Sequence, residues 1–173
     1  MLHSRTVTLL RAVVTNNPPF VQATRKYLGE LILACFDGRP EARDYAERLS
    51  TASAELLENA LKYSPAGTNL VVRLSKTTTE LLLQVSNALR DEGRDVLTSI
   101  RREIGAVWAE HDAKEAFRRK VMASLADPKA KAMLGYAKIR METGGRLRAR
   151  LGSGGRLEVT LAFLLFPPQS PLR

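Results

Sequence analysis

The residue types that this chain lacks exclude several kinds of functional site. Its single cysteine, Cys35, permits no internal disulfide and lies in an apolar helical segment, where we expect a buried and inert thiol. Its two histidines, His3 and His111, have no cysteine or carboxylate neighbours at metal-ligand spacing, so we predict no structural metal. Aromatic residues make up only 6%, which argues against a stacking platform for single-stranded nucleic acid.

Long hydrophobic runs are also missing. The longest, Leu31 to Phe36, is far shorter than the roughly 20 residues that a membrane-spanning helix needs. The first 17 residues hold a weak apolar stretch that Arg5 and Arg11 interrupt, without a small-residue cleavage site typical of a secretory signal. We therefore expect a cytoplasmic protein without a membrane partner.

The chain does have the composition of a globular protein with an excess of basic charge. Its 173 residues, 45% hydrophobic and 26% charged, predict a single domain over residues 1–173. The net charge is +9, and residues 90–150 hold 15 Lys and Arg against 9 Asp and Glu. Such charge attracts nucleic acid, anionic lipid or an acidic protein, and a solvated helical face is the plainer alternative. The role of region 90–150 stays open.

Hydrophobic periodicity and turn residues predict an α+β fold. We expect a two-layer sandwich, with helices on one face of a mainly antiparallel mixed sheet. The cluster Gly152 to Gly155 predicts a hairpin turn, because the Gly-Lys-Ser/Thr of a phosphate-binding loop is absent. The expected elements are a strand over 6–15, a helix over 20–36, a helix from 41 to about 63 with a break near 50–51, strands over 69–75 and 80–86, helices over 95–141 interrupted near Asp112 and Asp127-Pro128, and strands over 146–151 and 156–166.

One helical stretch, from Glu55 to Ser64, carries the most chemical pattern in the chain. Glu55 and Asn59 are four residues apart and Lys62 follows three later, so all three side chains project from one face of the helix. A carboxylate, an amide and an ammonium on one face could hold a metal-bound phosphate. The alternative is a solvated face that only keeps the helix soluble.

The stretch resembles the asparagine box of the GHKL superfamily, the histidine kinase-like ATPases of the Bergerat fold. The family pattern Glu-x-x-x-Asn-Ala, followed by Lys and an aromatic residue, matches Glu55 to Tyr63 residue by residue. The resemblance implies that Asn59 ligates Mg²⁺, that Glu55 acts as a general base, and that Lys62 approaches the phosphates of ATP. Including the C-terminal helix and strands, it covers about residues 41–166.

Two glycine boxes that hold nucleotide in this family are altered here. Asn87 stands where the first box has the Asp that binds adenine, and Leu89 replaces a glycine whose backbone must approach the ligand closely. The second box retains only Gly135. Between the boxes the family has a mobile lid, whereas 95–132 reads as charged helices suited to a rigid partner surface. These changes make binding of ATP and Mg²⁺ doubtful.

Three hypotheses follow. The first is a regulator from a bacterial-type signalling system, similar to the kinase and anti-sigma components of partner-switching modules, that acts by docking another protein. The second is an active Mg-ATP-dependent serine kinase of such a module, and the third is a nucleic-acid-binding protein, although no recognition motif accompanies the charge. The family resemblance also implies a possible homodimer, which the apolar N-terminal strand or helix could form. His3 and His111 lack the helical hairpin of a phosphoacceptor, so an ordinary sensor kinase is not expected.

Overall fold

The computed structural model describes residues 6–89, 93–126 and 134–165, and their element order is the one predicted from the sequence. The predicted interruption at Asp127-Pro128 and the end of the last strand at Phe166 lie outside these residues. The elements are β1 (Val7–Thr15), α1 (Pro18–Cys35), α2 (Ala42–Tyr63), β2 (Asn69–Lys76), β3 (Glu80–Asn87), α3 (Gly93–Ala109), α4 (Ala113–Ala126), α5 (Leu134–Thr143), β4 (Arg146–Leu151) and β5 (Leu157–Leu164).

The five strands form one sheet in the order β1-β2-β3-β5-β4, and every neighbouring pair among the described strands is antiparallel. The predicted hairpin between β2 and β3 is confirmed, and it closes with the Thr77 N–H donating to the Glu80 carbonyl at 2.8 Å. The glycine cluster after β4 joins it to β5, as a hairpin turn predicts. β1 and β4 are the two edges.

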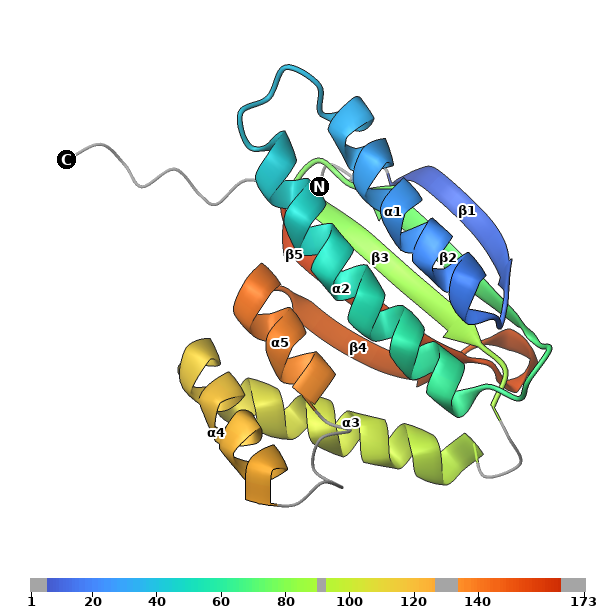
Figure 1. The fold of residues 1–173 in the computed structure, drawn as a ribbon, viewed down its shortest axis with the longest axis vertical. Helices are drawn as coiled ribbons and strands as arrows, with labels where there is room; N and C mark the ends of the chain where they lie inside the picture. Colours follow the sequence, from blue (N-terminus) through green and yellow to red (C-terminus); the bar gives the residue numbers. More distant parts are fainter. Residues whose placement is uncertain (1–5, 90–92, 127–133, 166–173) are drawn as a thin grey trace, which may run out of the picture.

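The helices α1, α2 and α5 pack across one face of the sheet, while α3 and α4 lie towards its β4 edge (Figure 1). Alternation along the strands explains this arrangement, since every second residue is apolar and points to the helices. In β2 these residues are Leu70, Val72 and Leu74, which are all fully buried. The predicted two-layer α+β fold is therefore confirmed, and the opposite side of the sheet, here named the open face, carries no described helix.

The helix α2 lies at the centre of the helical layer, between α1 and α5 and over β3 (Figure 1). It runs unbroken, so the predicted break near residues 50–51 is wrong. The helix continues through Ser50 because Leu49, Ala52 and Ser53 are fully buried in the core, and packing overrides the weak helix preference of Ser and Thr. The helix ends where Ser64 donates its hydroxyl to the Ala60 carbonyl ahead of Pro65.

The expectation that Cys35 is buried is also wrong, because its side chain is exposed. Cys35 is the last residue of α1, and the apolar stripe of that helix reaches the core through Leu28 and Ile32 instead. Helical periodicity explains the error, since an apolar segment at a helix end buries only one side. Within the described part of the chain, no helix is long and apolar enough to cross a lipid bilayer.

Candidate functional site

The two central residues of the predicted site, Glu55 and Asn59, lie on the side of α2 that meets α5. A Cβ placed on Gly135, near the start of α5, would lie 2.7 Å from Glu55 Oε2 and 3.6 Å from Asn59 Nδ2. Only glycine fits this close approach of the α5 backbone without displacing the carboxylate. The structure thus brings together three residues that the sequence placed in one site.

The Glu55 carboxylate of α2 already has an ion-pair partner in α5, the helix that also carries Gly135. Lys138 Nζ lies 2.8 Å from Glu55 Oε1, and the two side chains are 42% and 19% exposed. A carboxylate that accepts from an ammonium at this distance is held by it and is less available to a water or hydroxyl as a base. The sequence reasoning missed Lys138, although its position three residues after Gly135 places it one helical turn away.

Asn87, at the end of β3, reaches the same region from the sheet. Its side chain is 1% exposed, and its Nδ2 donates to the neighbouring Ala88 carbonyl at 2.9 Å. Asn59 and Asn87 line one small cavity between α2, α5 and the sheet, together with Tyr63 and Tyr136. The space left in it for ligand atoms is about 10 Å³, which holds at most a single water molecule.

Tyr136 of α5 is one of the large side chains that line this cavity. Its side chain is 5% exposed, and burial raises the pKa of its hydroxyl above the usual range. Among the described residues no hydrogen-bond partner faces this hydroxyl. Leu89, which replaces a glycine of the first box, packs against the core and is not among the residues that line the cavity. The signal for Tyr136 was present in the sequence as a bulky ring directly after the one remaining glycine.

Lys62 does not join the other candidate residues. Its side chain is exposed at the end of α2, and its ammonium lies 5.2 Å from the centre of the Tyr63 ring. No hydrogen bond or ion pair links it to Glu55 or Asn59 in the described structure. The helical spacing placed Lys62 on the correct side of α2, but the side chain extends to solvent.

The donor set around Asn59 is a poor fit to Mg²⁺. The cation prefers several hard oxygen ligands in octahedral geometry, and Lys138 competes for the carboxylate next to Asn59. No group of three or more His, Cys, Asp or Glu suited to a metal occurs within the described residues. The residues present thus offer one amide oxygen and a carboxylate already paired with an ammonium.

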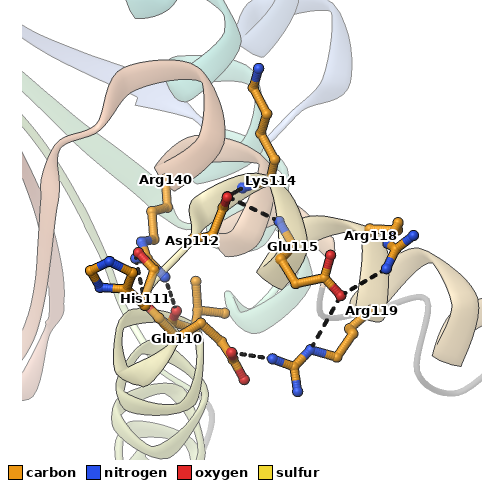
Figure 2. A network of polar contacts seen from close by, with 9 residues as sticks. Glu110, His111, Asp112, Lys114, Glu115, Arg118, Arg119 and Arg140 are labelled. Atoms are coloured by element: carbon orange, nitrogen blue, oxygen red, sulfur yellow. Dashed lines mark hydrogen bonds and ion pairs between the residues drawn. The ribbon is translucent and has the colours of Figure 1, made fainter.

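The basic helices of region 90–150 use much of their charge within the fold, as Figure 2 shows for the junction between α3 and α4. Arg140 of α5 donates to the carbonyls of Val107, Glu110 and His111 at the end of α3. Its guanidinium also lies 5.9 Å from the centre of the Trp108 ring. Cations at a helix C-terminus satisfy its free carbonyls and oppose its dipole, so Arg140 fastens α5 to α3.

The start of α4 at the same junction is capped by Asp112. Its carboxylate accepts from the backbone N–H groups of Lys114 and Glu115 at 2.7 and 3.2 Å (Figure 2). The hydrogen bond from Glu115, and to a smaller extent that from Lys114, lowers the pKa of the exposed Asp112 carboxyl. Arg119 pairs with Glu110 across the junction and Arg118 with Glu115. The predicted helices are present as α3 and α4, and Arg119 and Lys120 of α4 pair with Glu110 and Glu103; the rigid partner surface itself stays a prediction.

An apolar groove of about 370 Å³ lies between β1 and α1. The α1 side chains that line it include Phe20 and Tyr27, which are 56% and 52% exposed. β1 is an edge strand whose outer backbone groups have no described partner strand. Homodimerisation through this apolar N-terminal strand or helix stays a prediction.

Comparison with known proteins finds a solved structure with a similar fold. No family model matches the chain, and neither does any curated protein. A chain in the crystal structure of the SiaB-SiaC complex from Pseudomonas aeruginosa is similar, with a TM-score of 0.58 over 91% of each chain. Because the two sequences are only 18% identical, the likeness shows that this chain shares the fold of a component of that complex.

Proposed function

We propose that this protein is a signalling regulator that acts by binding another protein, through a histidine kinase-like ATPase domain that has lost its nucleotide pocket. The observation that carries the proposal is the packing of Tyr136 beside Asn59 and Asn87, which leaves about 10 Å³ of space. An adenine ring needs many times that volume, since small-molecule sites are commonly about 300–1,000 Å³. The pairing of Glu55 with Lys138 supports the same proposal.

The structural likeness supports a protein partner. The similar chain was crystallised in a complex of two proteins, SiaB and SiaC. A component of a two-protein complex carries out at least part of its function through an interface, and the shared fold offers this chain a comparable framework. We therefore place it among regulators of the partner-switching kind, with a signalling protein as its partner.

A second function, an active Mg-ATP-dependent serine kinase, is favoured by one observation. Glu55, Asn59 and Gly135 lie side by side where α2 meets α5, and the family resemblance implies a role for all three in binding metal and nucleotide. In that function Asn59 would hold Mg²⁺, and Glu55 would have to exchange Lys138 for the attacking hydroxyl. The kinase would also require Tyr136 to leave its buried position.

Calorimetric titration with ATP and Mg²⁺ distinguishes the two functions. We expect no heat of binding up to millimolar ATP, either in the unmodified protein or in an Asn59→Ala variant, each shown to be folded by circular dichroism. Micromolar binding that Asn59→Ala abolishes would overturn the proposal and establish a working pocket. Asn59→Ala is a suitable variant because it removes the amide oxygen and leaves the neighbouring Glu55–Lys138 pair intact.

A further inference from the structure

A row of polar and basic side chains crosses the open face of the sheet. Consecutive register pairs link Arg11 to Arg73, Arg73 to Gln84, Gln84 to Thr160, and Thr160 to Arg148. Residues directly opposite one another in a sheet project from the same face, so the five side chains form one line from edge to edge. At about 4.8 Å per strand the line spans roughly 19 Å.

Three arginines in this row have no counterion among the residues that the structure describes. Arg11, Arg73 and Arg148 are exposed, and no hydrogen bond or ion pair holds any of them within the described residues. Arg11 and Arg73 are direct neighbours, and like charges directly opposite destabilise a sheet. The fold thus carries an electrostatic cost here that no described contact within the chain offsets.

The rest of the open face has the same sign of charge. Arg146 pairs with Glu80 at 3.2 Å and Arg150 with Glu158 at 2.8 Å. Arg156 donates hydrogen bonds to the hydroxyl and carbonyl of Ser86 and to the carbonyl of Asn69. Arginines therefore outnumber carboxylates on this face, and an anionic surface laid against it would find a complementary potential.

A hollow on the open face lies over β3, β5 and β4. Its volume is about 210 Å³, and it is lined by Arg146 and Arg148, by Leu82 and Ala162, and by Glu80, which pairs with Arg146. Thr160 adds a hydroxyl. Because Arg146 is paired with Glu80, Arg148 is the guanidinium in the hollow that would bind a partner's carboxylate, through two parallel hydrogen bonds.

The chemistry of the face favours a protein over a nucleic acid. Val13, Val71 and Leu82 lie between the arginines, and among the described positions the open face carries no aromatic ring. Sequence-tolerant binding of single strands relies on aromatic stacking, whereas protein interfaces combine arginine with apolar contacts. A flat sheet face also offers no helix or ribbon to enter a duplex groove.

We propose that the open face of the sheet is the docking surface for an acidic face of a partner protein, whose carboxylates pair with Arg11, Arg73 and Arg148. This inference rests on the proposed partner-binding function and adds the surface and the partner's charge. Leu82, Val71 and Ala162 would meet apolar residues of the partner between those pairs.

Fluorescence anisotropy with two labelled probes tests this inference. The first probe is an amphipathic peptide of about 20 residues, with glutamate on its polar side and leucine on the other. The second is an oligothymidylate of about 20 nucleotides, which carries negative charge without an apolar side. We expect the peptide to bind more tightly than the oligonucleotide, and its affinity to fall with added salt.

Two matched triple variants locate the binding. The sheet variant carries Arg11→Gln, Arg73→Gln and Arg148→Gln; the helix control carries Arg43→Gln, Arg102→Gln and Lys114→Gln, which lose the same charge at exposed side chains of the helical layer. We expect the sheet variant to weaken peptide binding by about tenfold or more and the control by less than about twofold.

Equal losses in the two variants, no peptide binding, or tighter binding of the oligonucleotide would each overturn the inference. The proposed function fails separately, because it is tested by ATP titration and requires no binding at the open face.

Discussion

The two faces of the sheet differ in what their polar side chains are bound to. On the helix side, Glu55 is paired with Lys138, Asn87 donates to the Ala88 carbonyl, and Tyr136 lines the small cavity with Asn59 and Asn87. On the open side, Arg11 and Arg73 lie opposite each other with no described counterion. The side that resembles a nucleotide site is closed by contacts within the chain, and the side without a recognised motif holds charge that no described contact neutralises.

The same contrast separates two groups of arginines. In the helical layer Arg140 caps the end of α3 and Arg101 donates to the Ala149 carbonyl at 3.0 Å. On the sheet Arg73 and Arg148 have no comparable acceptor among the described residues. A count of basic residues along the sequence points to the helices, whereas the row of Arg11, Arg73 and Arg148, without a described partner, lies on the strands. Local charge density is thus a poor guide to a docking surface.

The largest loss of stability should come from Tyr136→Ala, which removes a buried ring that lines the small cavity. The ring is 5% exposed, so its removal should lower the free energy of unfolding by about 3–5 kcal/mol, as for other large aromatic truncations. Chemical denaturation measures this loss. Tyr136→Phe keeps the ring and removes a hydroxyl without a described partner, so stability should stay or rise by about 1 kcal/mol. A loss below about 1 kcal/mol for Tyr136→Ala would show that the ring is not the filling we describe.

The next effect tests the paired arginines of the helical layer. Arg140→Met removes donors from three carbonyls at the end of α3 and should cost about 2 kcal/mol, since hydrogen bonds to a charged group contribute about 1.5–3 kcal/mol. Arg102→Met, at an exposed site of α3 without a described partner, should change stability by less than about 0.5 kcal/mol. Thermal melts of both variants measure the two losses of stability. Equal losses would contradict the distinction between paired and unpaired arginines.

A smaller effect is expected for the ion pair that occupies the candidate base. Glu55→Gln should lower stability by about 0.5–1 kcal/mol, because the Lys138 side chain is 42% exposed and solvent screens the pair. A double-mutant cycle with Lys138→Gln isolates the pairwise energy, which we expect to be favourable. A catalytic carboxylate is often held at a cost to stability, so a clear gain from Glu55→Gln would favour the kinase instead.

The smallest effect should have the opposite sign. Arg73→Gln removes one of two like charges that face each other across β1 and β2, so stability should stay or rise by about 0.5 kcal/mol. The shift should be larger at low salt, where the repulsion is less screened. Denaturation at two salt concentrations measures it. A loss above about 1 kcal/mol would mean that Arg73 has a structural role, which would weaken its assignment to a partner.

Local signals were sufficient for the elements of the fold. Asn59 stands near the end of α2 because Ser64 and Pro65 stop the helix, and both signals are readable from the sequence. The meeting of Glu55, Asn59 and Gly135 followed from the family resemblance rather than from spacing. The closure by Tyr136 and the pairing of Glu55 with Lys138 could not be predicted, because each depends on how two helices distant in sequence pack.

The open face illustrates the same limit. Arg11 and Arg73 are far apart along the chain, and only the register of β1 on β2 sets them opposite each other. A shift of one residue would have moved one arginine to the helix side, since side chains alternate along a strand. Register depends on the whole sheet and its turns, so the sequence shows the arginines but not the row that they form.

The most direct test of this account is a backbone amide NMR spectrum of isotope-labelled protein, recorded alone, with Mg-ATP at millimolar concentration, and with the acidic amphipathic peptide. The account predicts that ATP leaves the signals of Asn59, Asn87 and Gly135 in place, while the peptide shifts those of Arg73, Arg148 and Thr160 on the open face. Saturable shifts at Asn59 and Gly135 on addition of ATP, with no change on the open face from the peptide, would contradict it.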